Sequence, residues 1–132
     1  MMKTFDQIMK SLFYHKTAWF VDMFGKIKSN QTTLYLDRNN CTSQQHIEKW
    51  LCINDLLNIA HGLNDGWEPD WTDRNQDKFS LTSLDNGGFD VEKTNTISHS
   101  FVYFKTESLA QEAIQIIGAE KLNKIFKNVV KK

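Results

Sequence analysis

Histidine, cysteine, serine and carboxylate side chains could carry catalysis, but in this 132-residue chain they are scattered. Nucleophilic catalysis needs a serine or cysteine beside a histidine and an orienting carboxylate. The available groupings are Ser98-His99-Ser100, His61 with Asp65 one turn further on, and Cys52. None of them lies in the strand-to-helix pattern of a nucleophile elbow. We therefore predict no catalytic residue and no enzymatic activity.

Metal ligation needs several donors that converge on one point. Residues 73–77 match the first, third and fifth positions of a calcium loop, but Lys78 replaces the sixth-position glycine and Leu84 replaces the twelfth-position glutamate. On an expected helix, His46 and Cys52 lie about 240° apart around the axis, too far round to share a zinc ion. We predict no metal and no cofactor, and we expect Cys41 and Cys52 to be buried or half-buried free thiols.

Charge is unevenly distributed along a chain whose 16 basic and 16 acidic residues cancel. Residues 1–52 carry a net +3, residues 53–92 a net −7 and residues 93–132 a net +4. An acidic middle is typical of a solvated loop with capping aspartates, or of a surface that meets a basic protein. On the second interpretation, the partner-binding residues are Asp65, Glu68, Asp70, Trp71, Asp73 and Asp77.

Two tryptophans lie within that acidic stretch, on either side of the single proline, Pro69. We expect Trp67 to close the end of a helix over the sheet. Trp71 has two interpretations, since it could pack internally or stay exposed as a residue that dominates binding.

Nucleic-acid binding is the alternative function. The lysines Lys121, Lys124, Lys127 and Lys131 follow helical spacing and could lie along phosphates, although lysines also favour helix C-termini. Phe101 and Tyr103 could stack on bases as in the aromatic strands of RNA-recognition domains, but the match to that pattern is partial.

The elements that must position these residues begin with a helix from Thr4 to Leu12. Residues 17–24 favour a strand, although a helix also fits, and a second strand over 32–36 would complete a hairpin. The clearest element is a long helix from about Ser43 to Leu63, opened by a capping box of Thr42 and Gln45. Its apolar residues cover more than half its circumference, so we expect it at the centre of the core.

The C-terminal half predicts a three-stranded antiparallel sheet over 78–82, 89–92 and 100–105. A helix capped by Thr106 should stop at Gly118, and a last helix should cover about 119–130. The predicted fold class is α+β, with the sheet packed on the long helix and the two C-terminal helices. We expect one domain over 1–132, with a variable N-terminal part (1–41) and a core (42–130).

A family resemblance rests on residues within 47–126. They are Leu56, Ile59, Ala60, Leu63-Asn64-Asp65-Gly66-Trp67, Pro69-Asp70-Trp71, Lys78-Phe79, Phe104-Lys105-Thr106, Leu109-Ala110 and Ala113. This pattern resembles an uncharacterised family of small proteins from Bacteroides-type gut bacteria and their phages. The resemblance implies an α+β fold and a phage or mobile-element accessory protein, with no catalytic residues to carry over.

These observations lead us to expect a non-enzymatic phage-associated protein that binds a macromolecule through its acidic surface. A host or phage protein is the expected partner, and inhibition of a host nucleic-acid or defence enzyme is one form of this hypothesis. A second copy of the chain stays open as a partner. No apolar run approaches the roughly 18 residues of a membrane span and the N-terminus lacks a signal-peptide pattern, so we expect a cytoplasmic protein with no membrane partner.

Overall fold

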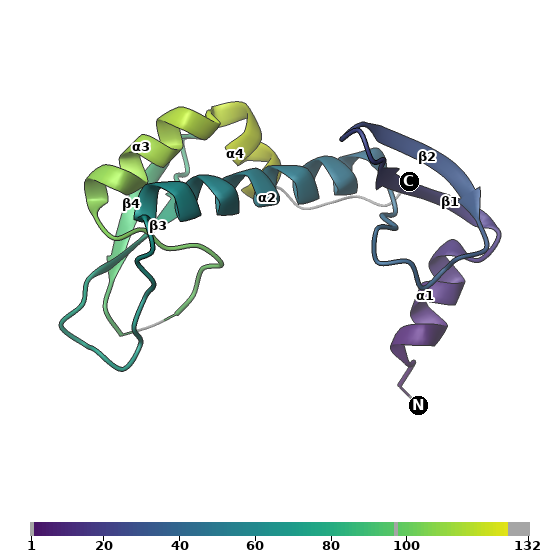
Figure 1. Ribbon diagram of the computed structural model, residues 1–132, viewed down its shortest axis with the longest axis horizontal. Helices are drawn as coiled ribbons and strands as arrows, with labels where there is room; N and C mark the ends of the chain where they lie inside the picture. Colours follow the sequence, from purple (N-terminus) through teal and green to yellow (C-terminus); the bar gives the residue numbers. More distant parts are fainter. Residues whose placement is uncertain (1, 97, 127–132) are drawn as a thin grey trace. The chain divides into compact units, whose positions relative to one another are not determined.

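The computed structural model describes residues 2–96 and 98–126. It shows an α+β fold with the order α1 (Phe5–Phe13), β1 (Lys16–Val21), β2 (Ile27–Thr32), α2 (Gln44–Asn64), β3 (Lys78–Ser83), β4 (Phe89–Thr94), α3 (Glu107–Ile117) and α4 (Ala119–Phe126) (Figure 1). The chain packs as two compact units, an N-terminal unit up to Leu51 and a C-terminal unit from Cys52 onward. This boundary lies inside α2, further along the chain than the expected division after residue 41.

The N-terminal helix is confirmed. The Thr4 side chain accepts a hydrogen bond from the Gln7 backbone N–H, and the Gln7 side chain accepts one from the Thr4 N–H, which completes a capping box. Met9 and Phe13 of this helix pack on Ala18 of β1 as a small buried cluster.

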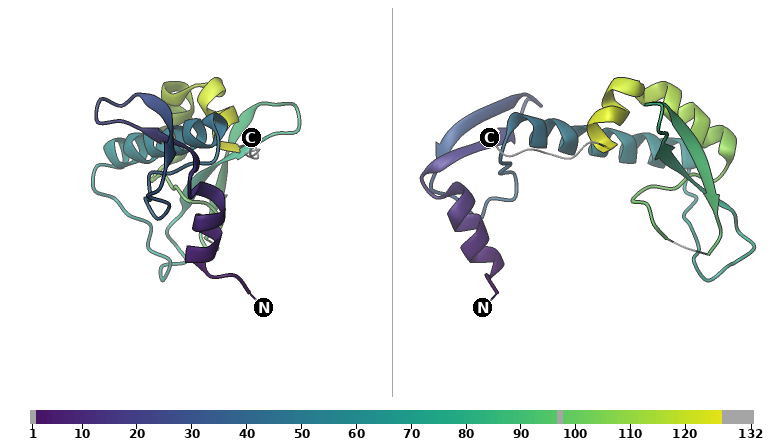
Figure 2. Two further views of the ribbon diagram at one scale, coloured as in Figure 1. Left: turned by 90° about the vertical axis from the view of Figure 1, so that its right-hand side faces the viewer. Right: turned by 180° about the vertical axis from the view of Figure 1, so that it is seen from behind.

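A hairpin follows α1, but its second strand lies earlier than expected. β1 and β2 pair antiparallel from Lys16↔Thr32 to Val21↔Ile27 as a curved ribbon (Figure 2). The prediction placed this strand at 32–36 because the apolar residues there resemble a strand. Gly25 instead adopts a φ of 79°, which allows a tight turn, so the polar residues 27–32 pair with β1.

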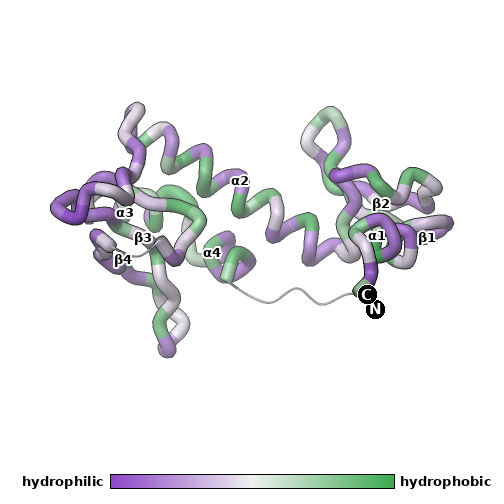
Figure 3. The backbone as a smooth tube through the Cα atoms, turned by 90° about the horizontal axis from the view of Figure 1, so that it is seen from below, coloured by the Kyte–Doolittle hydropathy of each residue, from purple (hydrophilic) through white to green (hydrophobic). Residues whose placement is uncertain are grey.

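The long helix α2 is confirmed within one residue at each end, but its cap differs from the prediction. The Ser43 hydroxyl, rather than that of Thr42, accepts a hydrogen bond from the N–H of His46, the third residue of the helix, at 3.1 Å. The second bond of the box also differs from the prediction. The Thr42 N–H donates to His46 Nδ1 at 3.0 Å, so the accepting side chain is His46 rather than Gln45. Polar and apolar residues alternate along the whole helix (Figure 3).

In the C-terminal unit, β3 and β4 form a two-stranded antiparallel ladder from Lys78↔Thr94 to Ser83↔Phe89. The predicted third strand over 100–105 is wrong: this segment makes a single bridge, Phe79↔Phe104, on the other side of β3. The Val102 N–H, which would be the next group to bond β3 in an antiparallel ladder, donates instead to the Ser100 hydroxyl at 3.4 Å. On the side that faces away from β3, the Tyr103 carbonyl and the Lys105 N–H bond the side chain of Asn64. Within the described residues, β4 pairs only with β3.

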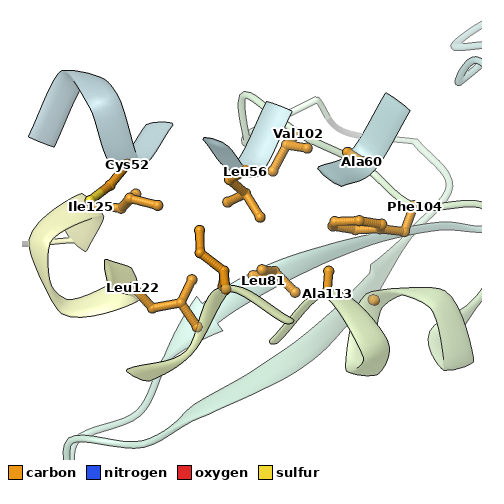
Figure 4. Close-up of a cluster of buried hydrophobic side chains, with 11 residues drawn as sticks. Cys52, Leu56, Ala60, Leu81, Val102, Phe104, Ala113, Leu122 and Ile125 are labelled. Atoms are coloured by element: carbon orange, nitrogen blue, oxygen red, sulfur yellow. The ribbon is translucent and has the colours of Figure 1, made fainter. Parts of the chain in front are cut away.

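The core of the C-terminal unit forms where α2, β3, the 102–104 segment, α3 and α4 meet. Leu56, Phe104 and Leu122 are fully buried there, and Figure 4 shows Cys52 of α2 beside Ile125 of α4. Thr106 caps α3 and Gly118 ends it, as predicted. Ala110, Ala113 and Ile117 form the buried face of this helix, whereas Ile116 is exposed. The predicted last helix is described as far as Phe126; its predicted remainder lies outside the described residues.

Candidate functional site

The end of α2 sets up the candidate site. Asn64 is the last helical residue and is buried. Asp65 and Gly66 then take positive φ values of 47° and 86°, which turns the chain away from the helix axis. The Trp67 N–H donates to the Asn64 carbonyl at 3.0 Å, so the tryptophan is held one short turn beyond the helix.

The Asn64 side chain joins this helix end to a segment far along the chain. Its Nδ2 donates to the Tyr103 carbonyl at 2.9 Å, and its Oδ1 accepts from the Lys105 N–H at 3.0 Å. One buried amide therefore satisfies a donor and an acceptor of the opposing backbone. This pair of bonds fixes the 101–105 segment against α2.

A cleft of about 590 Å³ lies between these elements. Its volume falls in the range of about 300–1,000 Å³ that is usual for ligand sites. Aliphatic and aromatic side chains make up most of its walls, whereas His61, Asn64 and Glu68 bring polar groups. The lining residues are Leu57, Ala60, His61 and Asn64 of α2, then Gly66, Trp67, Glu68 and Pro69, then Phe101, Val102 and Tyr103.

The aromatic residues of the cleft differ in how much of their side chains is exposed to solvent. Phe101 is 47% exposed, and Trp67 is half-buried. Tyr103 is buried, and its hydroxyl accepts hydrogen bonds from the N–H groups of His99, at 2.6 Å, and Ser100, at 2.8 Å. Phe101 and Trp67 are therefore the rings that a bound molecule would meet first.

Residues 65–77, which we name the acidic loop, carry five carboxylates and one basic residue. All five predicted carboxylates are exposed. Asp70 accepts from both the backbone N–H and the hydroxyl of Thr72, and Asp73 accepts from the Asn75 N–H, so these two stabilise turns. The carboxylates of Asp65, Glu68 and Asp77 make no hydrogen bond or ion pair with the residues that the structure describes.

The bonds to Thr72 also hold the pKa of Asp70 below its ordinary value of 3.8, and the charge of Lys78 acts in the same direction. Asp70 therefore stays ionised while it serves as a turn cap. Among the predicted partner-binding carboxylates, only Glu68 lines the cleft itself.

Trp71 is engaged inside the C-terminal unit. The Trp71 ring contacts the ring of Tyr103 edge-on, with the two centroids 4.9 Å apart. The Lys78 amine lies 4.8 Å from the centroid of the Trp71 ring. The half-buried Trp71 therefore packs against residues of its own unit, which favours the interpretation that this side chain packs internally.

Lys78, the residue that breaks the calcium-loop pattern, has a role that the sequence reasoning missed. It is fully buried, and its amine donates to the carbonyls of Asp73, at 3.1 Å, and Gln76, at 2.9 Å. An internal ammonium therefore organises the loop, in the way that a bound cation organises other loops. The signal in the sequence that could have indicated this role was the position of Lys78 at the start of β3, directly after an aspartate-rich turn.

The residues of the nucleic-acid alternative are only partly in place. Tyr103 is 7% exposed, so its ring has no free face for a base. Lys121 is ion-paired with Asp55 at 3.0 Å, and this bond raises the lysine pKa. Lys124 is half-buried and makes an interaction of its own. Lys127 and Lys131 lie outside the described residues, as does Lys132.

The groups considered for catalysis or metal binding take separate positions. Cys52 is buried in the core, His61 lies at the cleft, and His99 Nε2 lies 3.4 Å from Glu92 Oε1. Cys41 and Cys52 are both buried and unbridged, as expected, and burial raises the pKa of Cys41. In residues 2–96 and 98–126, no three His, Cys, Asp or Glu side chains gather as a metal site would require.

No protein-family model, curated protein or solved structure matches this chain. The helices of the described ranges include none that is both long enough and apolar enough to cross a bilayer. The site is accordingly interpreted from its own residues.

Proposed function

We propose that this chain is a non-catalytic binding protein whose cleft and acidic loop engage a basic, partly apolar segment of a macromolecular partner. The observation that carries the proposal is the cleft itself, which is lined by the exposed Phe101, the half-buried Trp67 and the exposed Glu68. Aromatic side chains supply large contact areas, and a nearby carboxylate favours a cationic residue of the ligand.

A protein partner fits this arrangement better than a nucleic acid. The acidic loop would repel phosphates, and the buried Tyr103 cannot stack on a base. The resemblance to phage-associated proteins favours a host or phage protein as the partner, and we propose the cytoplasm as the compartment. Inhibition of a host nucleic-acid or defence enzyme is the form of the proposal that fits an accessory protein best.

The experiment is an affinity capture from the native host, together with selection from a random peptide library. The bait variants are Glu68→Gln, Asp65→Asn and Phe101→Ser, because these side chains are exposed and substitution should leave the turns formed by Asp70 and Asp73 intact. Glu112→Gln, on the exposed face of α3, is the matched control.

We expect the selected peptides to carry a basic residue beside an apolar one. Glu68→Gln and Phe101→Ser should each reduce capture by at least about tenfold, which corresponds to about 1.4 kcal/mol. Capture should also weaken with added salt. Equal recovery of the partner by the wild type, by Glu68→Gln and by Phe101→Ser would contradict the proposal.

A further inference from the structure

The turn between β1 and β2, residues 22–26, exposes two large apolar side chains side by side in the sequence. We name these five residues the hairpin tip. Met23 is 88% exposed and Phe24 is 80% exposed. Apolar side chains presented together at such a tip, with so little of their surface covered, are typical of a contact with something outside the protein.

Asp22 holds the hairpin tip in one conformation. Its Oδ1 accepts from the N–H groups of Phe24 and Lys26, both at 2.9 Å. Its backbone carbonyl accepts from the Gly25 N–H at 3.0 Å, and its N–H donates to the Lys26 carbonyl at 2.9 Å. Three consecutive N–H groups of the turn therefore have partners within the turn itself.

This self-contained bonding distinguishes between two kinds of apolar surroundings. A protein pocket can offer polar groups to an inserted loop, whereas lipid acyl chains cannot, so backbone that enters a bilayer must satisfy its own donors. The turn of the hairpin tip meets that requirement at Phe24, Gly25 and Lys26.

The charges around the tip have one predominant sign. Residues 16–32 carry Lys16, Lys26 and Lys28 against the single acid Asp22, a net +2. Lys28 pairs with Asp22 Oδ2 at 3.0 Å, and the bonds to Lys26 and Lys28 hold the pKa of Asp22 below its ordinary value. An apolar end flanked by lysines matches a surface with apolar tails beneath anionic headgroups.

We propose that the hairpin tip binds the surface of an anionic phospholipid bilayer, with Met23 and Phe24 entering the headgroup and acyl-chain boundary. The contact would be peripheral and reversible. It departs from the expectation of no membrane partner, which rested on the lack of a spanning segment and of a signal-peptide pattern. Neither criterion detects a two-residue apolar tip on a locally basic hairpin.

The test is co-sedimentation of the purified full chain with phosphatidylcholine vesicles that contain or lack phosphatidylserine. We expect binding to the phosphatidylserine vesicles that is stronger by about tenfold or more than to phosphatidylcholine alone. The double variant Met23→Ser, Phe24→Ser should lose this binding. Leu34→Ser, which removes an apolar side chain that is 69% exposed outside the tip, is the matched control and should bind normally.

A second measurement locates the contact and guards against misfolding. In a Phe24→Trp variant, brominated lipids should quench the added fluorescence, while circular dichroism confirms that every variant keeps its helices. Lys26→Gln should reduce the preference for phosphatidylserine without abolishing binding.

Absence of binding to phosphatidylserine vesicles would overturn the proposal and leave a protein pocket as the partner of the tip. Vesicle binding that the double variant retains would overturn it as well. Neither result bears on the cleft, because the proposed function is tested with substitutions at Glu68 and Phe101.

Discussion

The amine of Lys78 lies 4.8 Å from the ring centroid of Trp71, and the lysine is fully buried beneath the acidic loop. The same amine bonds the carbonyls of Asp73 and Gln76. A single cation thus connects the tryptophan that the sequence suggested as a binding residue to the turns around it.

Lys78→Met should destabilise the C-terminal unit by about 2–4 kcal/mol, because two carbonyls lose their buried donor. Urea unfolding measures this loss, and the fluorescence of Trp71 should shift as its surroundings change. The exposed Lys93 of β4 is the control, since Lys93→Met should cost less than about 0.5 kcal/mol. Equal effects of the two substitutions would refute the role of Lys78.

Asn64→Ala should also destabilise the protein, by about 2–4 kcal/mol, because the Tyr103 carbonyl and the Lys105 N–H both lose a buried partner. Asn64→Asp keeps the acceptor for Lys105 but places a carboxylate against the Tyr103 carbonyl, so it should not restore stability. Thermal unfolding compares these variants with Asn58→Ala on the exposed face of α2. A rescue by aspartate would show that the bond to Tyr103 contributes little.

Tyr103→Phe removes the hydroxyl that accepts from the His99 and Ser100 N–H groups. We expect a loss of about 1–3 kcal/mol and faster hydrogen exchange at these two amides. NMR-detected exchange separates this local effect from global unfolding. Tyr14→Phe, at a residue that is 41% exposed, serves as the control. Unchanged exchange at His99 and Ser100 would mean that the hydroxyl does not hold this turn.

The start of α2 should be sensitive to acid. Burial, reinforced by the charge of Lys49, holds the pKa of His46 below its ordinary value of 6.5, and the neutral ring accepts the Thr42 N–H at Nδ1. The unfolded chain therefore takes up this proton at a higher pH than the folded chain does. The resulting stability is fully present above pH 6.5 and declines as the pH falls below it.

Urea unfolding over a pH series checks this expectation. His46→Gln should flatten the pH dependence just below 6.5. An identical pH dependence in wild type and His46→Gln would assign the effect to other groups.

Two glycines offer a paired test of backbone strain. Gly118, between α3 and α4, has a φ of 85°, whereas Gly62 lies inside α2, and an added Cβ would meet no atom within 4 Å at either position. Gly118→Ala should cost about 1–2 kcal/mol from conformation alone. Gly62→Ala should stabilise the protein by about 0.5–1 kcal/mol. Thermal unfolding of both variants would contradict the φ argument if the two shifts had the same sign.

Sequence reasoning succeeded where the signal is local. The Thr106 cap sets a helix start through a hydrogen bond that spans three residues, and Gly118 sets a helix end, so α3 was predicted closely. The N-terminal helix was predicted from the helical spacing of its apolar residues. Sequence reasoning failed where a distant group decides. The 100–105 segment has the composition of a strand, yet it bridges β3 only at Phe104, and on its other side the distant Asn64 side chain bonds the Tyr103 carbonyl and the Lys105 N–H.

The candidate site was predicted less well than the fold, for the same reason. Glu68 was identified from charge alone, but its place beside Phe101 depends on the turn at Asp65 and Gly66 and on the amide of Asn64. Phe101 was assigned to the alternative function. No short-range pattern brings Asn64 and Tyr103 together, because the hydrogen bond between them joins residues 39 positions apart.

Because β4 pairs only with β3 among the described strands, it is an edge strand, and this matters in concentrated solutions of the protein. A strand bonded on one side offers free amide and carbonyl groups along the other, where a neighbouring molecule could add its own strand. The exposed side chains of β4 include Asp90, Glu92 and Lys93, whose hydration disfavours such stacking. This flank should therefore keep concentrated protein from growing into fibrils.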